Sequence, residues 1–222
     1  MSKRIEPAPR AVIFDMDGTL ADTFPLVVAA WNAAMSGHAG RTFSAEEVIA
    51  RFGVPDPAMI RREVPAEMGD QCVEIYHQHY EQQHADLARA FDGIADMLAA
   101  IKGRGLPTGV MTGKGKRSAV ITLAALGWEN MFDVVVTGED VERQKPDPQG
   151  LFIVCGKLGV TPRDCVFVGD SPADIGAGKN AGMRTIVAGW HPVYLEQLRA
   201  MAPDYWAETP GDVAELVGAS AR

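Results

Sequence analysis

The residues of this chain best suited to chemistry are two aspartates, Asp15 and Asp17, which follow the short apolar run AVIF. Such a run predicts a strand buried on both faces of a parallel sheet. Because alternate residues of an extended segment point to the same side, both carboxylates would project beyond the end of this strand. Two carboxylates so close together repel each other unless a cation lies between them, and Mg²⁺ is the cation that commonly binds such a pair. The alternative is a strand end followed by an Asp-Gly turn, with both acids simply hydrated.

Three further polar residues, Thr112, Lys145 and Asp170, come after other short apolar runs that predict strands. The carboxyl ends of parallel strands meet at one edge of a sheet, so we expect these side chains to converge with the two aspartates. Thr112 could instead serve only a turn, Lys145 could lie in a solvated turn before a helix, and Asp174 could cap a helix. Asp170, which directly follows the apolar run CVFVG, is harder to explain in this way, since burying its carboxylate is costly unless it is paired or bound to a metal.

The elements that would position these residues form two parts. Helices are predicted over Pro25–Met35, from a Ser-x-x-Glu capping box at Ser44 to near Gly53, from Asp56 onward, and over Gln71–Arg89. Strands are predicted at 108–111, 134–136, 165–168 and 185–187, with helices between them and after Asp147-Pro148, and a helical tail from Leu195 with a short Tyr205-Trp206 segment. Alternating strands and helices predict an α/β core with helices on both faces of a parallel sheet. We therefore expect a core of residues 1–21 and 91–222 and a helical insert of residues 22–90.

Composition limits the classes of function. The chain has 222 residues, 47% of them hydrophobic and 23% charged, as in a water-soluble globular protein. Its formal charge of -8 argues against a nucleic-acid or anionic-membrane partner. No apolar run has the length of a signal-peptide core or a membrane span, so a cytoplasmic location is expected. The three cysteines, Cys72, Cys155 and Cys165, are expected to be reduced thiols.

The motifs DMDGT, VMTG, KPDP and GDSPAD occur in this order, and with them the chain resembles the haloacid dehalogenase-like superfamily. The insert looks like the cap of the phosphoglycolate phosphatase and β-phosphoglucomutase branch. This resemblance implies a Rossmann-like core with an α-helical cap domain. It also implies that Asp15 is a nucleophile forming an aspartyl phosphate, and that Asp17 is the general acid and then the base. In relatives that displace halide or cleave a carbon–phosphorus bond the Asp17 position is not an acid, so the pair favours phosphate esters.

The resemblance further assigns ligands. Mg²⁺ would be held by the Asp15 carboxylate, the Asp17 backbone carbonyl and Asp170, with Asp174 bound through water or anchoring the other ligands. Thr112 and the backbone N–H of Gly113 would bind the phosphoryl oxygens, and Lys145 would balance their charge and orient Asp15. Relatives commonly carry Asn where this chain has Gly113, so a side-chain contact to the substrate is lost here.

The expected function is a Mg²⁺-dependent phosphatase of a small phosphorylated metabolite, with phosphoglycolate the leading substrate, acting as a monomer or homodimer. Two alternatives stay open: a mutase that moves the phosphoryl group between sugar hydroxyls, which Thr19 argues against weakly because mutases tend to carry Val there, and a non-catalytic regulatory protein. Candidate specificity residues of the insert are Tyr76, His77, His79, Tyr80, His84 and the segment 53–56. His77, Glu81 and His84 would share one helix face, which could hold a metal but is better explained as a solvated or packed face.

Overall fold

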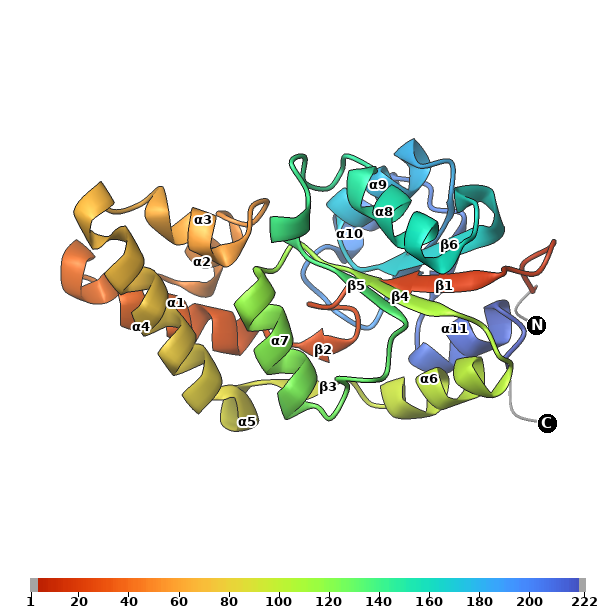
Figure 1. Ribbon diagram of the computed structural model, residues 1–222, viewed down its shortest axis with the longest axis horizontal. Helices are drawn as coiled ribbons and strands as arrows, with labels where there is room; N and C mark the ends of the chain where they lie inside the picture. Colours follow the sequence, from red (N-terminus) through yellow and green to blue (C-terminus); the bar gives the residue numbers. More distant parts are fainter. Residues whose placement is uncertain (1–3, 220–222) are drawn as a thin grey trace.

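The computed structural model describes residues 4–219, and its centre is a six-stranded sheet with the order β5-β4-β1-β6-β7-β8. Every neighbouring pair in this sheet is parallel. The strands are β1 (Ala11–Phe14), β4 (Thr108–Met111), β5 (Val134–Val136), β6 (Cys165–Gly169), β7 (Arg184–Ala188) and β8 (Tyr205–Ala207). The predicted α/β class with a parallel sheet is therefore confirmed, and Figure 1 shows β1 running through the middle of the core.

Helices cover both faces of this sheet, which explains why its strands are largely apolar. On one side lie α6 (Ile94–Gly103), α7 (Lys116–Ala125) and α11 (Pro210–Leu216), and on the other α8 (Gln149–Leu158), α9 (Pro172–Asn180) and α10 (Leu195–Ala200) (Figure 1). Within β1, Val12 and Phe14 pack toward the first side, whereas Ala11 and Ile13 pack toward the second. Alternate residues of one strand thus fill two separate hydrophobic layers.

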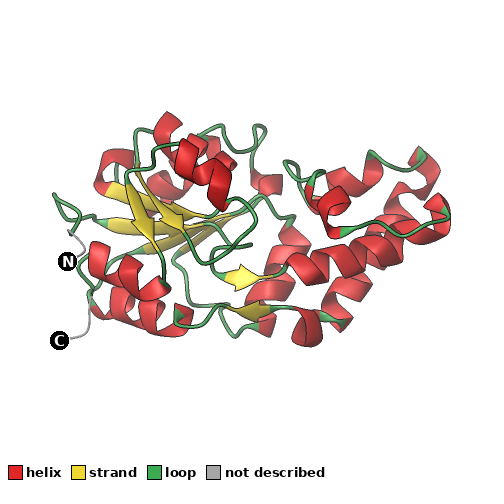
Figure 2. Cartoon of the chain, turned by 180° about the vertical axis from the view of Figure 1, so that it is seen from behind, coloured by secondary structure: helices red, strands yellow, loops and turns green. Residues whose placement is uncertain are grey.

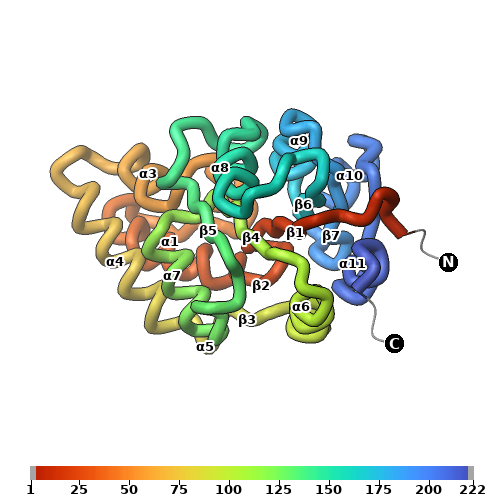
Figure 3. Tube along the Cα trace, turned by 45° about the vertical axis from the view of Figure 1, so that its right-hand side comes forward, coloured from red at the N-terminus to blue at the C-terminus, as the bar shows by residue number. Residues whose placement is uncertain are grey.

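The insert consists of helices with a hydrophobic core of their own. They are α1 (Phe24–Ala39), α2 (Ala45–Ile49), α3 (Asp56–Arg61), α4 (Gly69–Gln82) and α5 (His84–Leu87), with a single 3-10 turn at Ala66–Met68. Trp31, Tyr76 and Tyr80 are fully buried where α1 packs on α4. Figure 2, coloured by secondary structure, shows this helical part projecting from the sheet, and Figure 3 shows α7 of the core beside α4.

Two predicted boundaries in the insert were wrong. The second helix, opened by the Ser44 capping box as predicted, ends at Ile49 and not near Gly53. The single helix predicted over residues 71–89 is broken after Gln82 into α4 and α5, and the chain then becomes extended at β3 (Arg89–Ala90).

The chain leaves and re-enters the core at one place. The two residues of β2 (Ala21–Asp22) pair antiparallel with β3, so that Ala21 lies opposite Ala90. This small ribbon was not predicted. It lies at the proposed limits of the cap, residues 22–90, and we retain that division, with the core as 1–21 and 91–222, as a proposal.

The remaining expectations about the fold concern cysteines and membranes. Cys72, Cys155 and Cys165 are all buried free thiols. Among the helices of residues 4–219, none combines the length and the apolar character needed to cross a bilayer.

Candidate active site

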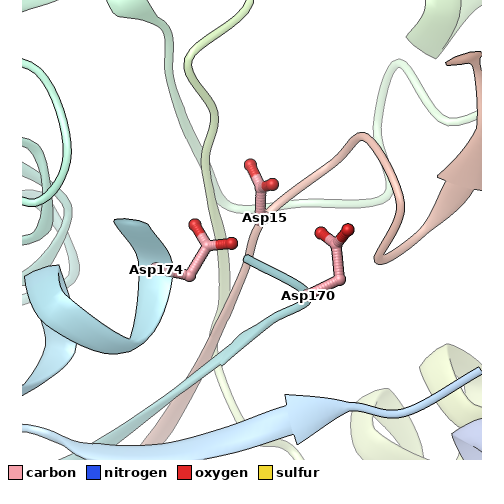
Figure 4. Close-up of side chains that lie close together, drawn as sticks. All are labelled: Asp15, Asp170 and Asp174. Carbon is pink, nitrogen blue, oxygen red and sulfur yellow. The ribbon is translucent and has the colours of Figure 1, made fainter. Parts of the chain in front are cut away.

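Three carboxylates converge at the carboxyl edge of the sheet. Asp15 follows β1, Asp170 follows β6, and Asp174 lies in the first turn of α9. One oxygen of each lies within 4.8 Å of the others, and Figure 4 shows Asp15 between the other two side chains. The backbone builds this cluster: the N–H of Asp15 donates to the carbonyl of Val168 at 2.9 Å, which aligns the ends of β1 and β6. The Ser171 capping box then turns the chain so that Asp174 faces back toward the sheet.

Lys145 joins this cluster from the loop after β5. Its Nζ lies 2.8 Å from Asp15 Oδ1 and 2.6 Å from Asp174 Oδ1. Burial alone would lower the pKa of Lys145, but the two carboxylates outweigh burial and raise this pKa, so the lysine is charged. Burial, together with the neighbouring acids Asp174, Asp170 and Asp17, raises the pKa of Asp15 well above its ordinary value in spite of Lys145.

The acid cluster has the composition that a hard divalent cation requires. Asp15 Oδ1 faces the ammonium of Lys145, yet it and Asp170 Oδ2 are buried and accept no hydrogen bond of good geometry from any residue between 4 and 219. Burial raises the pKa of Asp170 also, which shows that the carboxylate lacks sufficient compensation from the protein. Three carboxylates gather here beside the single ammonium of Lys145. Carboxylate oxygens free to coordinate, grouped at this spacing, fit Mg²⁺. The ligand role of the Asp17 carbonyl stays a prediction.

Gly18 explains why a glycine follows the second aspartate. Its φ is +77°, and a Cβ built there would lie 2.1 Å from Asp170 Oδ2. Any larger residue would therefore displace the Asp170 carboxylate. Thr19 adds a further restraint, because its hydroxyl donates to Asp170 Oδ1 at 3.0 Å. The DMDGT motif thus both supplies Asp15 and holds Asp170 in place.

The predicted phosphate-binding residues lie at the adjacent strand end. Thr112 is buried directly after β4, and its hydroxyl accepts a hydrogen bond from the N–H of Lys114 at 3.2 Å. Gly113 lines the same pocket as the carboxylates. A Cβ at Gly113 would meet nothing within 4 Å, so the space that a side chain would fill here is open. Thr112 and Gly113 thus line the same pocket as Asp15, and their role in binding a phosphoryl group stays a prediction.

Comparison with known proteins agrees with this geometry. A family model described as haloacid dehalogenase-like hydrolase matches residues 12–188. The chain belongs to this family. Pyrophosphatase PpaX of Bacillus velezensis is 31% identical over 94% of this chain and 96% of its own length. Phosphoglycolate phosphatase of Xylella fastidiosa is 35% identical over 82% of this chain and 81% of its own length. N-acetylmuramic acid 6-phosphate phosphatase of Pseudomonas aeruginosa is 33% identical over 89% of this chain and 87% of its own length.

Solved structures show the same fold at lower identity. A phosphoglycolate phosphatase, described as predicted, from Haemophilus somnus matches with a TM-score of 0.82 and 22% identity over 93% of this chain and 97% of that one. CbbY from Rhodobacter sphaeroides, solved in complex with phosphate, matches with a TM-score of 0.80 and 24% identity over 91% of this chain and 95% of that one. The expected family, fold and enzyme class, a phosphatase among the haloacid dehalogenase-like hydrolases, are confirmed.

In this hydrolase Asp17 has a partner that the sequence did not reveal. The Asp17 carboxylate accepts a hydrogen bond from Thr23 and lies 3.0 Å from the Nζ of Lys114. Lys114 is buried and stacks over the Tyr80 ring at 4.8 Å. Burial alone would lower the pKa of Lys114, but Asp17, Tyr80 and Asp56 raise it. The sequence offers little to predict that Lys114 is buried, because GKGK is typical of an exposed loop. Its position two residues after Thr112 is the one indication that it lies near the site.

The loop after β7 also supports the site and was not predicted. His191 is buried, with its Nδ1 3.5 Å from Asp170 Oδ2 and its ring 4.5 Å from the ring of Phe24. The indole N–H of Trp190 donates to the carbonyl of Thr19 at 3.0 Å. This loop therefore contacts both Asp170 and the DMDGT turn. No spacing or motif in the sequence distinguishes these two residues.

A pocket of about 340 Å³ lies between the carboxylates and the insert. Apolar side chains of the insert form much of its wall, among them Phe24, Val27, Ile49, Phe52 and Met59. Some of the candidate specificity residues line this pocket, namely Tyr76 and, within the segment 53–56, Gly53, Val54 and Asp56. The others do not line it: His77, His79, Tyr80 and His84.

The face of His77, Glu81 and His84, which could have held a metal but was better explained as a solvated or packed face, is not assembled as a metal site. His77 and His84 are buried in different helices, and Glu81 is exposed. His77 Nε2 contacts Asp56 at 3.1 Å, and His84 Nε2 contacts Thr122 at 3.3 Å. These histidines therefore pack against their neighbours.

Asp56 connects the insert to the core next to the phosphate-binding turn. It begins α3 and accepts hydrogen bonds from the N–H of Gly115 at 2.7 Å and the hydroxyl of Ser118 at 2.8 Å, both in the core. Burial alone would raise the pKa of Asp56, but the contacts with His77, Gly115 and Ser118 and the charge of Lys114 hold its pKa below the ordinary value. The carboxylate is therefore ionised and has partners of its own.

Replacing Asp56 with Ala should lower the free energy of unfolding by about 2–4 kcal/mol, because it leaves buried donors of the core unpaired. The matched control is Asp70→Ala, whose carboxylate is exposed and pairs with Arg61 at the surface, for which we expect less than about 1 kcal/mol. Urea unfolding measures both values. Equal effects would contradict the role of Asp56 as a link.

The same link predicts a pH dependence. A carboxyl whose pKa is lowered by folding contributes stability above its unfolded pKa, about 4, and that contribution is lost as the pH falls through the folded value. The difference in unfolding free energy between the wild type and Asp56→Asn should therefore be largest at neutral pH and shrink below pH 4. Unfolding curves at pH 7, 5 and 3 test this, and a difference that grows in acid would contradict it.

Proposed function

We propose that this hydrolase is a Mg²⁺-dependent phosphatase that hydrolyses a small phosphorylated metabolite through a phospho-Asp15 intermediate. One observation carries the proposal: Asp15, Asp170 and Asp174 gather within 4.8 Å, with the ammonium of Lys145 2.8 Å from Asp15. A nucleophilic carboxylate, a cation-binding set of acids and a buried lysine are the groups that phosphoryl transfer requires.

In the first step Asp15 attacks phosphorus, and the bond from phosphorus to the leaving oxygen breaks. Asp17 donates its proton to that oxygen, and then accepts a proton from the water that hydrolyses the aspartyl phosphate. Lys145 neutralises charge on the phosphoryl oxygens, which Thr112 and the N–H of Gly113 hydrogen-bond. Mg²⁺ would shield the negative charges of the nucleophile and the phosphate from each other. It would be held by Asp15, Asp170 and the Asp17 carbonyl, with Asp174 bound through water or anchoring the other ligands.

The named activities of the relatives guide the choice of substrate. Pyrophosphatase, phosphoglycolate phosphatase and N-acetylmuramic acid 6-phosphate phosphatase are all phosphatases of small molecules. We propose phosphoglycolate as the leading candidate. We further propose that the enzyme acts in the cytoplasm as a monomer or homodimer, without a nucleic-acid or membrane partner.

A generic ester tests the activity itself. With p-nitrophenyl phosphate we expect a yellow product only when Mg²⁺ is present, and a screen of phosphorylated metabolites with released phosphate measured identifies the substrate. A sugar 1-phosphate separates the mutase: inorganic phosphate indicates a hydrolase, whereas the 6-phosphate indicates phosphoryl transfer between hydroxyls. No turnover of any of these compounds with Mg²⁺ would favour the regulatory alternative.

A further inference from the structure

Lys114 is a buried cation at the active site that the proposed mechanism does not use. Its backbone is fixed on both sides, since its N–H donates to Thr112 at 3.2 Å and its carbonyl accepts from the N–H of Gly138 at 3.0 Å. Its side chain lines the pocket and is only 3% exposed. Removing an ammonium from water costs several kcal/mol, so a lysine held here requires a compensating partner.

The position of this ammonium is defined by the general acid. Lys114 Nζ lies 3.0 Å from Asp17 Oδ1. Asp17 must come within hydrogen-bond reach of the leaving oxygen, so Lys114 Nζ lies within about 6 Å of that oxygen. This is the distance at which an anionic group bonded next to the leaving oxygen could contact the ammonium.

Of the described residues that line the pocket, the other cation is bound to carboxylates on the phosphoryl side. Among the described residues, Lys114 and Lys145 are the cationic side chains in the pocket wall, and Lys145 is bound to Asp15 and Asp174 on the phosphoryl side. Asp56 is satisfied by Gly115, Ser118 and His77. The apolar wall of the insert offers no charge. Lys114 is therefore the group that can stabilise negative charge on the leaving-group side.

We propose that Lys114 makes the enzyme selective for substrates whose leaving group carries a negative charge next to the oxygen released. This class comprises phosphate esters of α-hydroxy carboxylates and phosphoanhydrides. The inference rests on the proposed function and specifies the substrate class of the same site. The ammonium contacts the carboxylate or second phosphate in the bound substrate and, as the leaving oxygen gains charge, attracts that oxygen as well.

A pair of isosteric substrates tests this selectivity on the wild-type enzyme. Phosphoglycolate and its amide, carbamoylmethyl phosphate, differ in the charge of one group and almost not in size. We expect kcat/KM for the acid to exceed that for the amide by about 30-fold or more, the size of one charge-assisted hydrogen bond. Pyrophosphate provides the anhydride member of the class.

Lys114→Met removes the charge and retains the length of the side chain. Because Lys114 also pairs with Asp17, this variant lowers kcat/KM for every substrate, and we expect kcat/KM for phosphoglycolate and pyrophosphate to fall about 30-fold further than that for the amide. The matched control, Lys116→Met, removes an exposed lysine two residues away and should leave both values unchanged. A lysine that only stabilised the fold would lower all rates by the same factor.

The outcomes separate the inference from the proposed function. Hydrolysis of the amide as fast as the acid by the wild type, or an equal loss for both in Lys114→Met, overturns the inference and leaves the phosphatase intact. Turnover of p-nitrophenyl phosphate without any of phosphoglycolate or pyrophosphate does the same. No Mg²⁺-dependent turnover of any ester or anhydride overturns the proposed function itself.

Discussion

Asp15→Asn should reduce turnover by on the order of 10⁴-fold or more, because an amide cannot attack phosphorus and form the phosphoenzyme. The fold should be retained. Burial and the neighbouring acids Asp174, Asp170 and Asp17 raise the pKa of Asp15 in spite of Lys145, so removing its charge relieves both the cost of burying it and the repulsion within the cluster. We therefore expect the variant to melt no lower than the wild type in EDTA. The rate of p-nitrophenyl phosphate hydrolysis and a thermal melt give the two measurements.

The control for this variant is Asp22→Asn, an acid of the same stretch that lies on β2 and outside the pocket. It should retain near wild-type rates. Rapid quenching with a ³²P-labelled substrate should trap label on the wild type and none on Asp15→Asn. Activity of Asp15→Asn above a few per cent of wild type would contradict the assignment of Asp15 as the nucleophile.

Loss of the metal should have the second largest effect. Chelation with EDTA should abolish activity, and added Mg²⁺ should restore it. Asp170→Asn, which removes one of the three clustered carboxylates, should raise the Mg²⁺ concentration for half-maximal rate by about 100-fold or more. A binding readout is independent of turnover: Mg²⁺ at 100 times its dissociation constant stabilises the folded state by about 2.7 kcal/mol.

We therefore expect Mg²⁺ to raise the melting temperature of the wild type but not that of Asp170→Asn at the same concentration. The control is Asp164→Asn, since Asp164 is a partly exposed acid at the opposite end of β6. This variant should respond to Mg²⁺ as the wild type does. A full response from Asp170→Asn would place the cation elsewhere.

The sequence predicted the sheet and its edge well because these depend on local patterns. β4 and β5 coincide with their predicted ranges, since strands covered on both faces of a parallel sheet are rich in apolar residues. Asp15, Thr112 and Asp170 follow such runs directly, so parallel pairing alone brings them to one edge. Lys145 was also expected to follow a strand, but a loop with a 3-10 turn at Gly138–Asp140 separates it from β5, so parallel pairing alone does not explain why it joins the cluster.

The parts that sequence patterns missed depend on contacts between distant segments. Lys114 is buried only because Asp17 and the insert residue Tyr80 enclose it. His191 gains its place from Asp170 and Phe24. α4 ends at Gln82 with neither Gly nor Pro to mark the break. The strands of the β2–β3 ribbon have two residues each, too few to show a periodicity.

The β2–β3 ribbon has a consequence for the evolution and engineering of such enzymes. Because Ala21 pairs with Ala90, the ends left by deleting everything between them lie about 5 Å apart, a gap that a two-residue hairpin turn closes. A different lid could therefore be grafted at the same two points without altering the order of the strands. Substrate preference could then diversify by exchange of whole modules, while the chemical groups on the sheet stay as they are.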